Sequence, residues 1–150
     1  MDHATKAQAY FLEGYNCAQS VLLAFAPDLG LTKEDAARMA SSFGGGMGRL
    51  REVCGALSAS FLILGLREGY SSPTDDEAKA RQYARVQEIA EQFRAIHGTI
   101  LCRDLLGLSE GPDCPTPAKR TAEYYESRPC ERCIGDAAAI VERMLFSNEG

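Results

Sequence analysis

Residues 43–59 read FGGGMGRLREVCGALSA, so five glycines and one cysteine fall within seventeen residues. Helical periodicity recurs through the rest of the chain, whereas the apolar/polar alternation of strands is hard to find. The stretch therefore places bare backbone beside a thiol in a chain that is otherwise helical. It indicates either a close contact between two helices or a thiol that holds a group which the backbone also approaches.

The segments on both sides of this stretch predict helices that glycine, proline and capping residues separate. Thr32 caps one helix, and Thr74 with Glu77 forms a capping-box pattern before a long one. Gly98 interrupts that long helix, and Gly107 ends it. The expected helices cover residues 5–25, 33–43, 48–66, 75–106 and 130–146, with a short addition at 118–127. This pattern predicts an all-α, single-domain helical bundle of about five helices over residues 1–150.

Composition narrows the classes of function. The 150 residues are 45% hydrophobic and 25% charged, which is typical of a soluble protein, and the net charge is −5 without a Lys/Arg-rich run. We therefore expect no nucleic-acid partner, because phosphate neutralisation needs clustered cations. The apolar segment 56–66 is too short to span a bilayer, and no signal-peptide pattern precedes it. We expect a cytoplasmic protein without a membrane span, and the sequence leaves a homo-oligomer open.

Six cysteines in such a chain favour metal binding or redox chemistry over permanent disulfides, because the cytoplasm is reducing. A free cysteine also serves as a small hydrophobic core residue, so each one alone is weak evidence. Cys17, Cys54, Cys102 and Cys130 lie on four different predicted helices. Every helix of a bundle turns one face inward, so these four thiols could converge in the interior.

Glycines accompany three of these thiols. Side chains on a helix lean over the preceding turn, which places Gly14 beneath Cys17 and Gly98 beneath Cys102. Gly55 directly follows Cys54. We interpret Gly14, Gly55 and Gly98 as space for an inorganic cofactor, with close helix–helix contact as the alternative. Residues 44–48 would then supply backbone N–H groups that favour anionic thiolates.

Cys130 and Cys133 form a C-x-x-C pair at the start of the last predicted helix. The helix N-terminus should lower the pKa of Cys130 and make it the better nucleophile of the two.

The remaining candidate residues are weaker evidence for a functional site. Cys114 lies in a proline-rich loop over residues 109–117, and a lone helical histidine such as His97 is more often structural than a ligand. Arg49, Arg51 and Arg103 could balance thiolate charge, although such residues are more often a solvated helix face.

Four blocks of sequence, in order, resemble a bacterial and archaeal family of redox-active proteins named for its C…GCAxxG…C…C cysteine pattern. The blocks are YNCAQSVL at 15–22, FGGGMGRLREVCGALSA at 43–59, HGTILCRDLLG at 97–107 and PCERCIGDAAAIVERML at 129–145. By this resemblance the family's four cysteines correspond to Cys17, Cys54, Cys102 and Cys130, with Cys133 as the alternative for the last. Ala59 stands where the pattern has its final glycine, and Cys114 is peculiar to this chain.

The resemblance implies a helical fold, redox-active cysteines and, in some relatives, an iron–sulfur centre with an unknown redox partner protein. Three functions stay open. The first is electron transfer or sensing through a small iron–sulfur cluster, of the [2Fe–2S] type, held by Cys17, Cys54, Cys102 and Cys130. The second is a thiol–disulfide oxidoreductase or thiol sensor that uses Cys130 and Cys133. The third is a non-catalytic bundle with structural zinc or buried free cysteines. Whether the chain is an enzyme, which would be of the oxidoreductase type, stays open.

Overall fold

The computed structural model describes residues 2–108 and 112–147. Within this part of the chain the protein is all-α and forms a single helical domain, as predicted. The α-helices are α1 (His3–Leu12), α2 (Cys17–Phe25), α3 (Lys33–Ala40), α4 (Gly44–Met47), α5 (Gly55–Glu68), α6 (Asp76–His97), α7 (Cys102–Leu105), α8 (Ala122–Ser127) and α9 (Cys130–Val141). Three short turns of other helical types are η1 (Ala26–Leu29), η2 (Ser41–Phe43) and the π-helical turn η3 (Glu142–Phe146). The helices outnumber the expected five, because several predicted segments are divided into shorter pieces.

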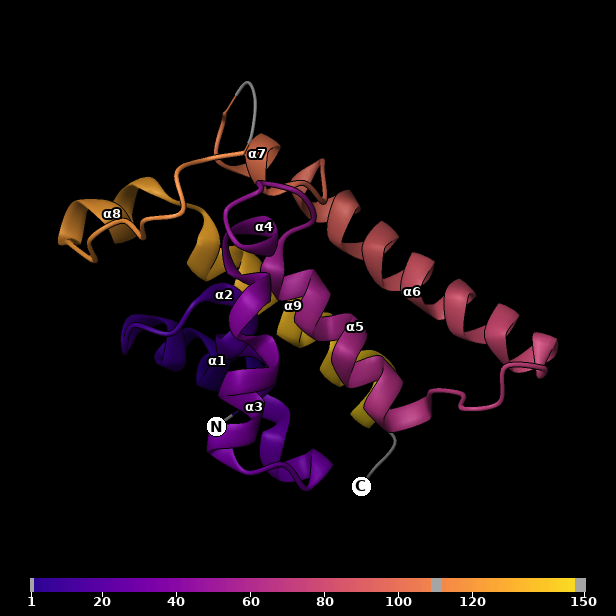
Figure 1. Cartoon of the computed structure of the whole chain (residues 1–150). Helices are drawn as coiled ribbons and strands as arrows, with labels where there is room; N and C mark the ends of the chain where they lie inside the picture. Colours follow the sequence, from indigo (N-terminus) through magenta and orange to yellow (C-terminus); the bar gives the residue numbers. More distant parts are fainter. Residues whose placement is uncertain (1, 109–111, 148–150) are drawn as a thin grey trace.

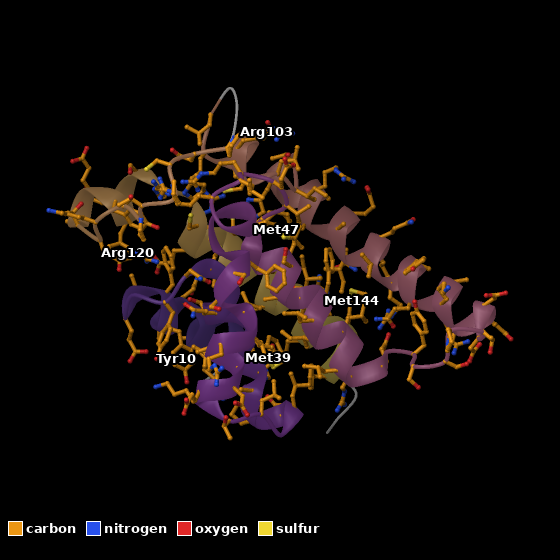
Figure 2. All side chains as sticks on the ribbon, in the orientation of Figure 1. Tyr10, Met39, Met47, Arg103, Arg120 and Met144 are labelled. Carbon is orange, nitrogen blue, oxygen red and sulfur yellow. The ribbon has the colours of Figure 1, made fainter. Side chains whose placement is uncertain are left out.

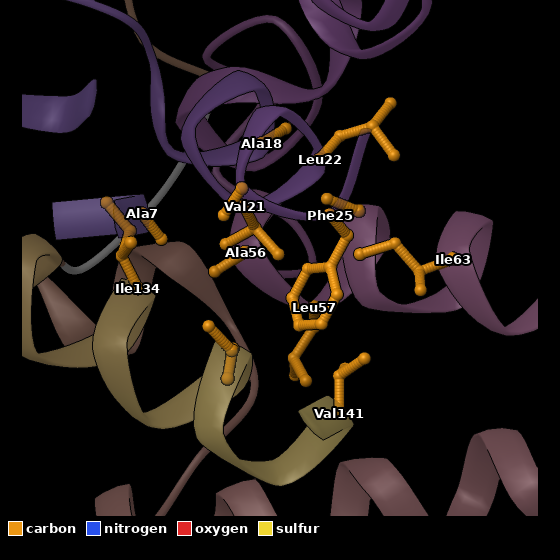
Figure 3. Close-up of a cluster of buried hydrophobic side chains, with 14 of the residues drawn as sticks. Ala7, Ala18, Val21, Leu22, Phe25, Ala56, Leu57, Ile63, Ile134 and Val141 are labelled. Carbon is orange, nitrogen blue, oxygen red and sulfur yellow. The ribbon is translucent and has the colours of Figure 1, made fainter. Parts of the chain in front are cut away.

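Helix α2 lies at the centre and packs against α1, α3, α5 and α9, while α6 covers α5 and α9 from the outside (Figure 1). Nearly all of α2 is buried, from Ala18 to Phe25 apart from Gln19. Figure 3 shows its apolar side chains against those of α5 and α9, with Phe25 beside Leu57 and Val141. Burying each large apolar side chain contributes roughly 1.5–3 kcal/mol, so this cluster supplies most of the stabilisation.

The three central helices α2, α5 and α9 run in the same direction. Their first residues approach one another at one end of the domain, where Cys17, Cys54 and Cys130 line one cavity. Their last residues meet at the other end around Phe146, whose ring lies 5.3 Å from that of Phe25 and 4.5 Å from the Arg67 guanidinium. The long connections through α3–α4 and through α6–α8 return the chain to the same end each time (Figure 1).

The predicted continuous helix over residues 5–25 is wrong. Helix α1 ends at Leu12, and Gly14 has a φ of +112°, outside the range of a right-handed helix. Asn16 then caps α2: its side chain accepts a hydrogen bond from the Gln19 N–H, and the Gln19 side chain accepts one from the Asn16 N–H. This break places Cys17 at the first residue of α2.

The predicted helix start at residue 48 is also wrong, because α5 begins at Gly55. Gly45 and Gly46 have positive φ values, and so do Met47, Arg49 and Arg51, which are not glycines. Left-handed residues cannot continue a right-handed helix, so residues 44–54 form a loop in which α4 is only one irregular turn. The loop makes Cys54 the N-cap of α5.

Helix α6 begins one residue later than the capping-box pattern predicts, since the Asp75 side chain accepts the hydrogen bond from the Ala78 N–H. The helix predicted to resume at Thr99 begins only at Cys102, as α7: residues 99–101 contain no helix, and Leu101 forms an isolated antiparallel bridge with Val53. Thr32 caps α3 and Gly107 follows α7 in a left-handed conformation, as predicted.

Helices α8 and α9 with η3 fall within the segments predicted for them. Of the predicted proline-rich loop, residues 112–117 contain no helix, and residues 109–111 lie outside the described residues. Apart from the isolated bridge, the described ranges contain no β-structure. None of the helices in these ranges combines the length and apolar character that crossing a membrane requires.

Candidate functional site

Five of the six cysteines line one cavity of about 60 Å³: Cys17, Cys54, Cys102, Cys130 and Cys133. They come from four separate parts of the chain, whereas Cys114 is exposed and does not line the cavity. The cavity is thus larger than the space that a single water molecule needs and has room for a group of several atoms. The four cysteines that the motif singles out and the second member of the C-x-x-C pair are thus brought together.

Each of the four motif cysteines stands at the start of a helix. Cys17, Cys102 and Cys130 are the first residues of α2, α7 and α9, and Cys54 is the N-cap of α5. Helix N-termini carry unpaired N–H groups and a partial positive charge. Three full helices and the short α7 therefore direct positive ends toward the cavity, which favours negative charge on the sulfurs. Sequence reasoning anticipated this position only for Cys130.

The bridge between Val53 and Leu101 fixes Cys54 beside Cys102. The Cys54 N–H donates to the Ile100 carbonyl at 2.8 Å, and the Cys102 N–H donates to the Glu52 carbonyl at 2.6 Å. These two hydrogen bonds hold the loop before α5 against the segment before α7. One pair of backbone hydrogen bonds therefore fixes the relative positions of two thiols that are far apart in the sequence.

Close approach of backbone to the thiols explains part of the glycine run. A Cβ on Gly55 would lie 2.6 Å from the Cys17 sulfur, and one on Gly46 would lie 2.6 Å from the Cys102 Cβ. The Gly45 N–H faces the Cys17 sulfur and acts to lower its pKa, in line with the expectation that residues 44–48 supply N–H groups. The missing side chains thus let the backbone at Gly55 approach Cys17 and the backbone at Gly46 approach Cys102.

Gly14 and Gly98 have a different role from the one predicted. Both end helices with positive φ values, and a Cβ on either would meet no described atom within 4 Å. The helical spacing that placed them beneath Cys17 and Cys102 does not exist, because each glycine and its cysteine lie on different sides of a helix break. A cofactor-binding role for Gly14 and Gly98 stays a prediction that no contact supports, whereas Gly55 touches the site.

The predicted low pKa of Cys130 is wrong. Burial, reinforced by the neighbouring Cys17, raises the pKa of the Cys130 thiol to about 12, although Arg128 and Arg120 partly oppose this effect. Burial and the adjacent Cys130 raise the pKa of Cys133 to about 12 as well. The pKa values of Cys17 and Cys54 are also raised, chiefly by burial. These four thiols therefore hold their protons at neutral pH until a cation or a base removes them.

Arg51 places a positive charge against one of the thiols. Its side chain is only 2% exposed, and Nη1 donates to the Cys102 sulfur at 3.4 Å. Nε and Nη2 donate to Asp113 Oδ2 at 3.3 and 3.0 Å, and Arg49 Nη2 donates to the same oxygen at 3.1 Å. Burial acts to lower the pKa of Arg51, but the bonds to Cys102 and Asp113 outweigh it and raise the pKa. Arg51 thus stays charged and orients Cys102.

His97, for which sequence reasoning favours a structural role over ligation, contacts the fifth cysteine, and Asp136, which sequence reasoning does not single out, contacts His97. His97 Nδ1 lies 3.9 Å from the Cys133 sulfur, and His97 Nε2 lies 2.9 Å from Asp136 Oδ2. The His97 side chain is 6% exposed and that of Asp136 is 38% exposed, so the pair connects a buried thiol with solvent. The sequence did contain a signal for Asp136: it lies three residues after Cys133, which places both side chains on one face of the same helix.

The cysteines surround a cavity rather than a point. No group of three or more His, Cys, Asp or Glu side chains within residues 2–108 and 112–147 is arranged to hold one metal ion. Structural zinc needs four ligands on a single ion, so this geometry gives the zinc alternative no support. In a polynuclear group the ligands bind different iron atoms, so thiolates that hold one need not converge on a single point.

Comparisons with known proteins agree with the cysteine pattern. A family model described as "Putative redox-active protein (C_GCAxxG_C_C)" matches residues 15–144, a span that includes all five cavity cysteines. Searches of curated proteins and of solved structures found no match.

Proposed function

The chain belongs to this family of redox-active proteins, and we propose that its five-cysteine cavity binds a small iron–sulfur cluster, of the [2Fe–2S] type, for electron transfer. One observation carries the proposal: thiols from four distant segments line a single cavity sized for a few atoms. Soft thiolate ligands suit iron in such clusters. When bound, the cluster would supply one-electron redox chemistry.

The residues that would hold the cluster are Cys17, Cys54, Cys102 and Cys130, the four at helix starts. Cys133 is the fifth thiol of the cavity and is the one beside His97. Because burial raises the pKa of the Cys17, Cys54 and Cys130 thiols in the free protein, loading must release protons from them. The helix N-termini, the Gly45 N–H and Arg51 then stabilise the negative charge that the thiolates carry, and these same groups would tune the potential.

The test is metal analysis of protein reconstituted without oxygen. We expect iron and acid-labile sulfide in equal amounts, with visible absorption that Cys17→Ser, Cys54→Ser and Cys102→Ser each abolish or shift strongly. Cys114→Ser is the matched control, since this exposed thiol lies outside the cavity, and it should retain full iron content. Colourless, iron-free protein after reconstitution would refute the cluster.

The contact between Cys133 and His97 favours a second candidate, dithiol–disulfide cycling. In this reaction Cys130 and Cys133 form one S–S bond, and the two electrons reduce a disulfide-bearing partner to two thiols. The two protons that Cys130 and Cys133 lose end on those thiols. His97 Nδ1 is placed to accept the Cys133 proton, and Asp136 holds the ring in position.

Glutathione disulfide distinguishes the two candidates. Dithiol cycling predicts that mild oxidation removes two alkylatable thiols, that mass spectrometry maps the bond to Cys130 and Cys133, and that a reductant restores them. His97→Gln should slow the oxidation without changing the thiol count. Unchanged labelling of Cys130 and Cys133 in oxidised samples would exclude this candidate.

A further inference from the structure

A second hollow, of about 250 Å³, adjoins the cysteine cavity. We call it the arginine vestibule, because its lining includes Arg49, Arg51, Arg120 and Arg128. Arg51, Arg120 and Arg128 line the cysteine cavity as well, so the two spaces share a wall. Among the described residues that line the vestibule there is no aspartate or glutamate.

The vestibule has an excess of positive charge in a chain whose net charge is −5. Arg49 and Arg51 share the single carboxylate of Asp113. Arg120 donates to the Phe11 and Tyr15 carbonyls, at 3.4 and 3.1 Å, and lies over the Phe11 and Tyr124 rings. Within the described residues its charge therefore faces carbonyls and rings and has no carboxylate partner. Figure 2 shows Arg120 below α8, on the side of α1 and α2.

Arg128 has hydrogen-bonding capacity to spare. Its guanidinium lies over the Tyr124 ring at 4.4 Å, a cation–π contact that fixes the plane of the group. No residue within 2–108 and 112–147 forms a hydrogen bond or ion pair with this guanidinium, so the N–H donors along its edge stay available. Gly44, Gly45 and Gly48 form part of the wall, and a Cβ on Gly48 would meet only the Ser42 carbonyl oxygen, at 3.8 Å.

We propose that the arginine vestibule binds the oxyanion group, carboxylate or phosphate, of a small molecule whose other end reaches the cysteine cavity. Planar guanidinium groups match such oxyanions with paired hydrogen bonds. The volume lies just below the roughly 300–1,000 Å³ typical of small-molecule sites, which suits a compact ligand. That this ligand is a redox substrate rests on the proposed function, whereas anion binding itself does not.

Calorimetric titration of the full-length, reduced, cluster-free protein at low salt tests the proposal, with inorganic phosphate and malonate as probes. We expect saturable binding of at least one of them, and the probe with the higher affinity identifies the preferred oxyanion. Arg128→Gln should weaken it about tenfold or more, because a charge-assisted hydrogen bond contributes about 1.5–3 kcal/mol. Arg128→Lys should restore part of the affinity, since it keeps the charge but loses the paired donors.

Arg38→Gln is the matched control, because Arg38 is an exposed arginine on α3 that lines neither space. Binding of neither probe, or equal weakening by Arg38→Gln and Arg128→Gln, would overturn the vestibule proposal. Iron and sulfide content, measured separately, keeps the two proposals apart. A protein that binds phosphate through Arg128 but takes up no iron would contradict only the cluster.

Discussion

The two ends of the central helices differ in what they bury. At their C-terminal ends Phe25, Phe146 and the ring of His3 stack, with His3 and Phe25 only 4.0 Å apart. At their N-terminal ends the same three helices present thiols, bare glycine backbone and the buried charge of Arg51. The first end is built on aromatic rings, with the carboxylates of Glu142 and Asp28 bonded to His3, whereas the second contains strained backbone and groups that are expensive to bury. The C-terminal ends of these three helices thus stabilise the fold, whereas their N-terminal ends hold the thiols of the candidate site.

The largest effect is expected from Phe25→Ala at the apolar end. Phe25 is fully buried, and truncating such a ring should lower the free energy of unfolding by about 3–5 kcal/mol. Urea denaturation measures this change. Met39→Ala, at a side chain that is 41% exposed, is the control and should change stability little. Equal losses in both variants would remove the distinction between core and surface on which the comparison rests.

The next effect tests the crowding of the cysteine end. An alanine at Gly46 combines a left-handed backbone with contacts of 2.6–2.9 Å to Cys102, Glu52 and Arg51. We expect Gly46→Ala to destabilise the fold by about 2–4 kcal/mol. Gly30→Ala shares the positive φ but meets nothing within 4 Å, so it should lose only about 1 kcal/mol. Similar urea midpoints for the two variants would show that the loop accommodates the added methyl group at Gly46 without cost.

The third prediction concerns alkaline pH. Burial raises the pKa of Cys130 and Cys133 from the ordinary 9.0 to about 12, so above pH 9 the unfolded state binds fewer protons than the folded state. Stability is therefore full below pH 9 and falls as the pH rises toward 12, by on the order of 1 kcal/mol per thiol near pH 10. Urea denaturation of the reduced, cluster-free protein measures the fall. Replacing both residues by alanine should reduce the slope, and an unchanged slope would contradict the raised values.

The smallest effect compares two helix caps. Asn16 caps α2 beside Cys17, and Thr32 caps α3 away from the cavity. Asn16→Ala and Thr32→Ala should each lower stability by about 1 kcal/mol. Only Asn16→Ala should also lower the iron content after reconstitution, because it loosens the first turn that carries Cys17. Equal iron content in both variants would mean that the position of Cys17 does not depend on its cap.

The sequence supports the all-α class, the Thr32 cap and the order of the motif cysteines, because these follow from local periodicity and capping chemistry. It does not reveal the breaks before Cys17 and Cys54. Positive φ at Met47, Arg49 and Arg51 is unfavourable locally and persists only because tertiary contacts hold the loop.

The candidate site shows the same division between local and tertiary information. The raised pKa of Cys130 depends on burial and on Cys17, which lies 113 positions away in the sequence. The contact of His97 with Cys133 depends on how α6 packs against α9. Spacing can nominate the residues of such a site, but their protonation and partners come from packing.

The cavity draws its walls from α2 near the beginning of the chain and from α9 near its end. A ribosome-bound chain that has not yet released residues 130–141 therefore lacks two of the five thiols and one side of the interior. Loading of the proposed cluster would thus need α9 in place, and the binding free energy would then help to hold this helix against α2 and α5. Deleting α9 would remove two cavity thiols and one side of the apolar interior in a single step.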